Sequence, residues 1–436
     1  MLYKGTLNVY FPCELKNSQE IKRMRRMWAD VMQGQRNLTR RLRFPNTNQM
    51  DILAFRQQKE DLLKAYQATW ATRLGVDLPN REESGCYATP ELADEYRHPR
   101  EDNLFVKSVS LKVSSFYVKY PPLTEGKDGV CIEGKLIFHV NVDNRVATAI
   151  VVFNFDRLSV DDVILLKHTF YKRCHVIIYE RDGERQFMQT ASTFQEYVTS
   201  KLKPIYPYLE TDIDNRARYM LLDVIEPIAN YPDIKLRNAI IYGMLTSDEG
   251  WRHAMNAGRN LGRNHSKRDA YQLYYNRKNA IVVTTLEAYS RYIQEKSRIW
   301  NSINHAQGHV EIPTFIDFYD VAGIDKQLFA KYLKTVELDY LINIASTNEI
   351  SNKIKKSLFN PIKLSYRAYR LWKILNELDM NLYHIDNEMH ESFEITCAID
   401  KVRTEYNEII GLLTNFLLLL VAVLTLLATL VTILKQ

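Results

Sequence analysis

A segment from Trp251 to Asn279 concentrates side chains that bind phosphate and stack on bases. It contains seven arginines and lysines against a single acidic residue, Asp269. Guanidinium groups form paired hydrogen bonds with phosphate oxygens, and glycines beside them leave backbone amides open to the same anion. Tyrosine rings give flat surfaces for base stacking, which is typical of single-strand nucleic-acid binding. The candidate ligand-binding residues are Arg252, Arg259, Arg263, Lys267, Arg268, Tyr271, Tyr274, Tyr275, Arg277 and Lys278.

Two other interpretations of this segment stay open: a solvated basic loop, or a surface that contacts anionic lipid head groups. A second basic stretch, from Ile21 to Phe44, favours a polyanionic ligand, because two such stretches are less easily accidental than one. Asp30 is its one acidic residue, and its basic residues are Lys22, Arg23, Arg25, Arg26, Arg36, Arg40, Arg41 and Arg43.

Motifs of catalysis and metal binding give little support for an enzyme. The sequence has no glycine-rich phosphate loop, no H-E-x-x-H and no G-x-S-x-G. A run of alternating histidines and acids, His384, Asp386, Glu388 and His390, has spacings that suit a metal, but such a run is more often a solvated helix face. We therefore expect no catalytic residue, no metal and no cofactor. The five cysteines are scattered without a C-x-x-C pair, which agrees with a reducing cytoplasm.

The C-terminal segment from Ile409 to Leu434 carries no charged residue. As a helix its 26 residues extend about 39 Å, which exceeds the roughly 30 Å of a bilayer's hydrocarbon and allows one tilted crossing. The N-terminus has no apolar signal-peptide region and reads as a strand. We therefore expect a single-pass protein whose preceding residues stay in the cytoplasm.

Small and polar residues of this membrane segment recur in heptad steps and form one stripe. In hydrocarbon such residues collect where helices touch or where they face water, so both helix packing and a pore lining stay open. A pore requires several copies around an axis, and Glu408 would then form a ring of carboxylates that favours cations. Alternatively, Glu408 is a solvated residue at a helix end. The candidate pore-lining residues are Glu408, Gly411, Asn415, Leu418, Ala422, Thr425, Thr429 and Thr432.

These residues need elements that position them, and the hydrophobic pattern predicts an α+β fold. Strands are expected near 2–11, 105–120, 130–141, 146–154, 175–179, 218–225 and 280–285, and helices at 19–42, 48–73 and 159–171. From Pro313 the pattern is helical to the end. The expected organisation is an α+β cytoplasmic sensor domain (1–311), a helical connector (312–361), a long stalk helix (362–408) and a transmembrane helix (409–434).

The stalk is expected to be one uninterrupted helix that continues into the membrane. It contains neither proline nor glycine from Ile362 to Ile410, and Pro361 suits its first turn. Leucines at four-three spacing give it a coiled-coil-like seam, with Leu371, Leu375, Leu378, Leu382, Ile385 and Met389 as the apolar positions.

This layout, a soluble domain followed by a long helix that enters the membrane, resembles the CorA-type divalent-cation channels over roughly Pro313 to Leu434. The Gly-Met-Asn signature and second membrane helix of those channels are not present in the sequence. The chain is more similar to the CorA-related effectors of bacterial anti-phage defence. That resemblance implies a homo-oligomer in the bacterial inner membrane. It also implies a nucleotide or single-stranded DNA oligomer that binds the cytoplasmic domain and gates a pore for ions, cations in particular. The alternative is a membrane-tethered enzyme or adaptor.

Overall fold

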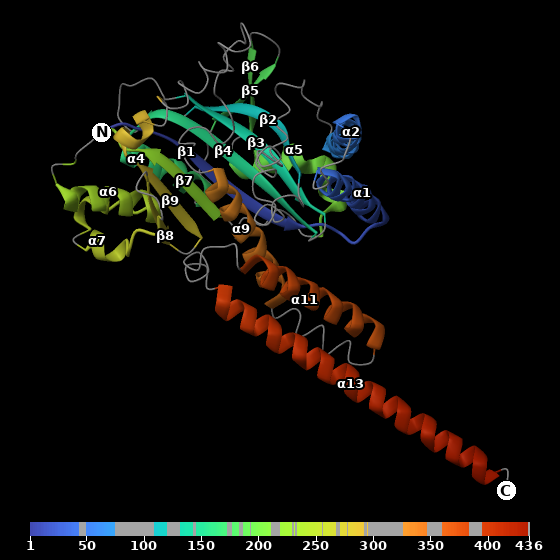
Figure 1. Cartoon of the computed structure of the whole chain (residues 1–436). Helices are drawn as coiled ribbons and strands as arrows, with labels where there is room; N and C mark the ends of the chain where they lie inside the picture. Colours follow the sequence, from blue (N-terminus) through green and yellow to red (C-terminus); the bar gives the residue numbers. More distant parts are fainter. Residues whose placement is uncertain are drawn as a thin grey trace. The chain divides into compact units, whose positions relative to one another are not determined.

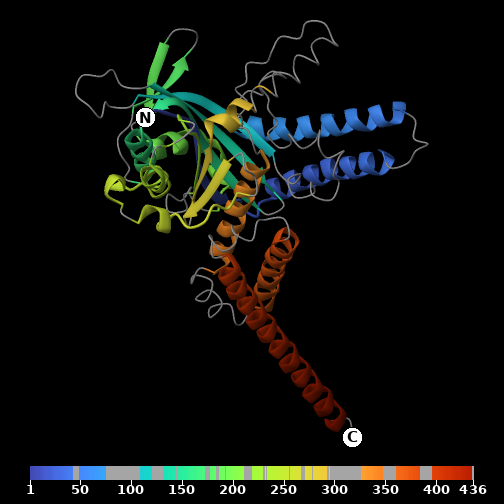
Figure 2. The ribbon, with the colours of Figure 1, turned by 60° about the vertical axis from the view of Figure 1, so that its left-hand side comes forward.

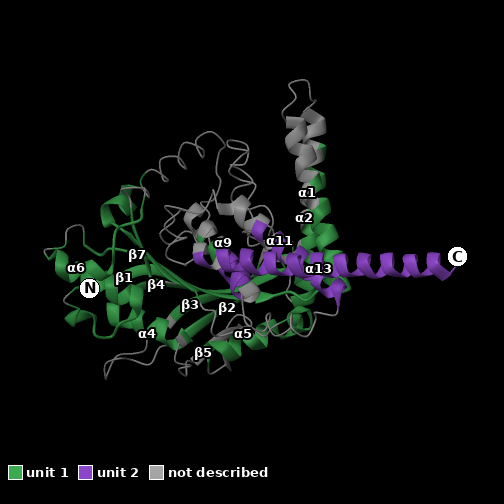
Figure 3. Ribbon diagram, turned by 90° about the horizontal axis from the view of Figure 1, so that it is seen from below, with its two compact units in different colours: residues 1–336 green, residues 337–436 purple. Residues whose placement is uncertain are grey.

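The computed structural model describes most of the chain as two compact units, residues 1–336 and 337–436 (Figure 3). The described residues are 1–42, 49–74, 109–119, 131–142, 145–171, 177–182, 186–191, 193–210, 219–228, 231, 233–254, 256–266, 271–276, 278–291, 294, 326–346, 360–382 and 395–434.

Unit 1 is built on a nine-stranded mixed sheet with the order β6-β5-β2-β3-β4-β1-β7-β9-β8 (Figure 1). Only β7 and β9 pair in parallel; the other neighbouring pairs are antiparallel. The strands are β1 Tyr3–Glu14, β2 Val109–Lys119, β3 Cys131–Asn141, β4 Val146–Leu158, β5 Ile177–Asp182, β6 Gln186–Ala191, β7 Tyr219–Ile225, β8 Tyr271–Asn276 and β9 Asn279–Thr284. The α+β class predicted from the sequence is confirmed.

Helices cover one face of this sheet through a continuous apolar core. Alternate residues of the central strand β1, such as Leu7, Val9 and Phe11, are buried on this face. Aromatic rings fill the middle of the core, and the Phe170 and Phe194 rings stack with their centroids 4.4 Å apart. The helices are α1 Gln19–Leu42, α2 Gln49–Leu74, α4 Val160–Tyr171, α5 Phe194–Leu202, α6 Ile234–Thr246 and the four-residue α7 Ala257–Asn260, with short 3-10 turns η2 Lys203–Tyr208 and η3 Trp251–His253.

Local hydrogen bonds explain where several of these helices begin. The Ser159 hydroxyl and the Asp162 carboxylate each accept a hydrogen bond from the other's backbone N–H, which forms a capping box at the start of α4. The side chains of Thr193 and Asp233 cap α5 and α6 by accepting one hydrogen bond each, from the backbone N–H groups of Glu196 and Lys235. α1 and α2, joined outside the described residues, lie side by side (Figure 2).

The opposite face of the sheet is buried and polar at its centre. Alternate residues of β1 that point this way include Thr6 and Asn8, which are 5% and 3% exposed. Thr6 lies opposite Asp223 of β7 in the ladder and donates a hydrogen bond to Asn154 of β4 over 3.3 Å. Tyr332 of α9 (Lys326–Ser346) closes part of this face, and its hydroxyl hydrogen bonds to two backbone carbonyl oxygens. A buried sheet face with so many polar groups is unusual for a protein core.

Unit 2 contains the second half of α9, then α11 (Pro361–Leu382) and α13 (Ile395–Leu434). α11 begins at Pro361, one residue before the first residue predicted for the stalk, and the Asn360 side chain caps it by accepting a hydrogen bond from the backbone N–H of Lys363. The prediction of one uninterrupted helix to the membrane is wrong, because α11 ends at Leu382 and packs against α13.

The stalk's apolar seam explains why α11 packs against α13 in place of the expected continuous stalk helix. Leu364, Ala368, Leu371 and Leu375 are buried on α11, and Ile399, Val402 and Ile409 are buried on α13. Such a seam needs an apolar partner but does not specify which helix supplies it, and here α13 of the same chain does. The seam positions Ile385 and Met389, and the His384–His390 run, lie outside the described residues.

Candidate anionic-ligand surface and membrane-spanning helix

The basic segment 251–279 folds into η3, α7, β8 and β9 and is attached to α6 of unit 1. Trp251, Ala257 and Leu261 anchor it in the core. Gly243 of α6 makes this packing close, since a Cβ there would lie 2.4 Å from the Cβ of Trp251. The segment is therefore a folded surface and not a free loop over its described part.

Arg252 is held by a neighbouring carboxylate. It forms an ion pair with Asp161 of α4, and its guanidinium carbon lies 4.7 Å from the centroid of the Trp251 ring. Trp251 Nε1 donates to the same carboxylate over 2.9 Å. Partial burial alone would raise the pKa of Asp161, but the hydrogen bonds from Trp251 and Arg252 hold that pKa below its ordinary value. Arg252 thus fastens η3 to α4 and is less available to a ligand.

Arg259 and Arg263 are exposed on either side of a turn at Gly262, whose φ of 71° is unfavourable for other residues. The Asn264 side chain joins Ser266 to Leu273 of β8, because its oxygen accepts hydrogen bonds from their backbone N–H groups (3.0 and 2.9 Å). These two guanidinium groups are the best-placed described cations of the segment for binding a phosphate.

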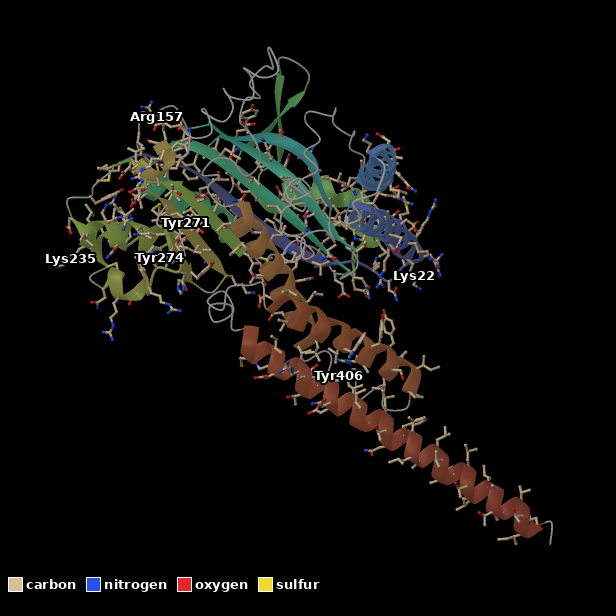
Figure 4. The ribbon with its side chains drawn as sticks, in the orientation of Figure 1. Lys22, Arg157, Lys235, Tyr271, Tyr274 and Tyr406 are labelled. Carbon is tan, nitrogen blue, oxygen red and sulfur yellow. The ribbon has the colours of Figure 1, made fainter. Side chains whose placement is uncertain are left out.

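Two of the three tyrosines proposed for base stacking are not accessible, which corrects that prediction. Tyr271 and Tyr274 lie in β8 and are only 5% and 7% exposed (Figure 4). Side chains alternate along a strand, so the two rings lie on opposite faces of β8, and both are covered. Tyr275 is half-buried, with its ring 5.4 Å from that of His265.

The remaining predicted ligand residues divide into two groups. Lys278 is half-buried and its Nζ lies 4.7 Å from the centroid of the Tyr219 ring. Lys267, Arg268 and Arg277 lie outside the described residues.

The second basic patch belongs to a different part of unit 1. Lys22, Arg23, Arg25 and Arg26 are exposed on α1, and Figure 4 shows Lys22 at the opposite end of the sheet from Lys235. The side chains of Arg36, Arg40 and Arg41, and all of Arg43, are not among those described. Over the residues that the structure describes, the α1 patch therefore lies apart from α6, on which the basic segment packs.

Lys167 of α4 stabilises α6, the helix on which the basic segment 251–279 packs. No pattern in the sequence indicates this role of Lys167. The residue is 1% exposed, and its Nζ donates to the Met244 and Leu245 carbonyl oxygens at the end of α6 (2.6 and 2.8 Å). Burial lowers the pKa of this amine to about 7. The Lys167 amine thus donates the hydrogen bonds that water would otherwise donate to the last carbonyl oxygens of α6.

The polar face of the sheet carries three buried polar side-chain atoms that, like Lys167, sequence patterns do not identify. Asn8 Oδ1, Asp223 Oδ1 and Thr284 Oγ1 are buried, and each lacks a hydrogen-bond partner in the structure. Burial raises the pKa of Asp223 to about 8. These residues are far apart in the sequence, so only the strand order β1-β7-β9 brings them onto neighbouring strands.

In the part of the chain that the structure describes, one helix is long and apolar enough to cross a membrane, from Ile399 to Leu434 within α13. Every residue from Leu417 to Leu434 is exposed, including large side chains such as Leu424 (56%). A helix with this composition and exposure requires an apolar solvent, and it is consistent with single-pass anchoring.

The predicted polar stripe lies on this exposed helix. The hydroxyls of Thr425, Thr429 and Thr432 each donate to the carbonyl four residues earlier, over 2.8 Å. The helix therefore satisfies these donors itself, while the oxygens can still accept a bond. A Cβ at Gly411 would meet nothing within 4 Å. Glu408, Asn415, Leu418 and Ala422 are exposed as well.

Among the described residues no three His, Cys, Asp or Glu side chains gather in a way that could hold a metal ion. No family model, no curated protein and no solved structure matches the chain.

Proposed function

We propose that this protein is a ligand-gated membrane channel of several identical copies, anchored by α13 in the bacterial inner membrane with unit 1 in the cytoplasm. The observation that carries the proposal is α13 itself, an exposed apolar helix with polar residues at heptad spacing. One helix cannot enclose a channel, so the proposal requires an oligomer around an axis. Its stripe then faces water and Glu408 selects for cations.

The ligand of unit 1 is a nucleotide or a single-stranded DNA oligomer, bound through phosphates by Arg259 and Arg263. The support for it is the fixed turn between the two exposed guanidinium groups. Because Tyr271 and Tyr274 are buried, recognition depends on the phosphate backbone more than on base stacking. By its layout the channel acts as an effector of anti-phage defence that disrupts the membrane.

Ion flux from liposomes tests the pore. In the variant Thr425→Leu/Thr429→Leu the stripe loses its polar surface, so flux should be abolished while the oligomer stays intact. Val423→Leu/Val431→Leu is the matched control, because it changes two exposed residues outside the stripe. Unchanged flux in the threonine variant removes these residues from the pore.

Oligonucleotide binding at several salt concentrations tests the ligand surface. Arg259→Ala/Arg263→Ala should weaken binding and reduce the slope of log K against log salt by about 0.7 for each phosphate that the variant no longer neutralises. The control is Arg23→Ala/Arg26→Ala, which removes two exposed charges from α1. If the control weakens binding and the first variant does not, the ligand binds the α1 patch.

A membrane-tethered enzyme or adaptor is the second candidate, and the polar face of the sheet favours an enzyme. Buried polar atoms without partners are uncommon, and a catalytic role is one of the explanations for such atoms. Deleting Ile409–Gln436 separates the two candidates. An enzyme keeps its activity without the anchor, whereas a channel loses its function.

A further inference from the structure

The outward face of α11 carries a stripe of large side chains that remain exposed. Ile362, Tyr366 and Tyr369 recur at helical spacing and are 81%, 49% and 55% exposed. Trp372 is 46% exposed, and its ring stacks on that of Tyr369 with their centroids 5.9 Å apart. The buried seam of α11 lies on the other side of the helix, so this aromatic stripe points away from α13.

The position of α11 along α13 brings the stripe to the beginning of the apolar span. Ile409 is fully buried, Leu412 and Phe416 are half-buried, and every later residue of the helix up to Leu434 is exposed. In a bilayer, the residues where burial ends and apolar exposure begins lie at the head-group layer. Tyrosine and tryptophan concentrate in this layer, because their rings are apolar and their N–H and O–H groups need water.

The charge of α11 favours an anionic surface. From Pro361 to Ile374 the helix has four basic residues and no acidic one. Lys363 is exposed next to Ile362. Basic residues close to a membrane surface are attracted to anionic lipid head groups. Two copies of α11 packed face to face would instead bring like charges together.

We propose that α11 is a membrane-interface helix that binds anionic phospholipid head groups through Tyr366, Tyr369, Trp372 and Lys363. This inference rests on the proposed anchoring by α13 but not on the pore or its ligand. In this proposal α11 sets the orientation of unit 2 at the bilayer surface.

Fluorescence of the full-length chain in lipid nanodiscs tests this proposal. Phospholipids brominated near the head group quench tryptophans that touch them. Replacing Trp372 by Phe should remove a quenched component of the emission, and the component should be larger in discs that contain phosphatidylglycerol than in pure phosphatidylcholine. The control Trp28→Phe removes a tryptophan that is buried in unit 1 (3% exposed) and should leave the quenched component unchanged.

The charge is tested separately by Lys363→Gln, which should reduce the difference between the two lipid compositions without affecting insertion. Equal quenching of the wild type and Trp372→Phe overturns the proposal. A changed subunit number in Tyr369→Ser/Trp372→Ser, with no lipid quenching, also overturns it and assigns the stripe to contacts between copies. Failure of the chain to enter the nanodiscs at all is a different result, because it contradicts the anchor.

Discussion

At the scale of single residues, burial separates the functional candidates from the structural ones. Arg252 and Arg259 are neighbours in the same basic segment, yet Arg252 is paired with Asp161 while Arg259 is exposed. Sequence composition assigns both to a ligand, because it registers charge but not partners. The same holds for Asp223, which is an ordinary acid in the sequence but is half-buried in the fold, with its Oδ1 enclosed and without a hydrogen-bond partner.

Asp223 should make stability depend on pH. Burial raises its pKa from 3.8 to about 8 in the folded protein. The carboxyl therefore releases its proton more easily in the unfolded chain than in the folded protein. Its contribution to the free energy of unfolding is complete below about pH 4 and is lost as the pH rises toward 8. We expect Asp223→Asn to gain stability relative to the wild type between pH 5 and pH 8, measured by urea unfolding in detergent.

The charge-matched control is Asp156→Asn, which removes a carboxylate that is 75% exposed and paired with Lys4 on the same sheet. It should follow the pH profile of the wild type. Parallel profiles for Asp223→Asn and the wild type would mean that Asp223 is solvated in the folded protein.

At the scale of elements, the candidate ligand surface depends on how η3 packs on α6. Lys167 holds the carbonyl end of α6, and Trp251 fills the space that Gly243 leaves open. These contacts place Arg259 and Arg263 on a fixed support, which is what precise binding of an anion requires.

Gly243→Ala should therefore destabilise unit 1 and weaken ligand binding together. The new methyl group would overlap Trp251, and such overpacking typically costs about 1–3 kcal/mol. The midpoint of thermal unfolding reports the first effect and oligonucleotide affinity the second. Gly250→Ala is the control, since the nearest atom to its new Cβ is Asp248 Oδ1 at 3.3 Å. Equal midpoints for the two variants would show that η3 is not tightly packed on α6.

At the scale of the whole molecule, the chain combines a mixed sheet domain with a helix whose exposed surface is almost entirely apolar. Exposed apolar side chains from Leu417 to Leu434 would cause aggregation unless lipid or other copies covered them.

We expect the full-length protein to float with liposomes in a density gradient and to resist extraction by alkaline carbonate. A chain that lacks Ile409–Gln436 should stay in the soluble fraction. A milder variant, Leu424→Arg, places a charge near the middle of the span and should reduce insertion, because an arginine there costs about 2.5–3.5 kcal/mol on translocon scales. Release of the full-length protein by carbonate would contradict a spanning helix.

Elements with strong periodicity could be predicted from the sequence alone. The first two helices agree with their predicted bounds to within one residue, and seven of the nine strands were predicted near their observed positions. The apolar run of α13 was also evident, because composition is enough to show whether a helix suits lipid. The pattern does not predict two short strands, β6 and β8; the three tyrosines of β8 are instead predicted as surfaces for base stacking.

Which faces are buried, and which helix meets the stalk seam, depends on tertiary packing. Heptad spacing specifies an apolar stripe but not its partner, so α11 packs against α13 where a continuous stalk was expected. Tyr271 and Tyr274 became core residues because β8 joins the sheet edge. The strand order places Asn8, Asp223 and Thr284 on the consecutive strands β1, β7 and β9, and this order depends on long-range pairing that no local pattern contains.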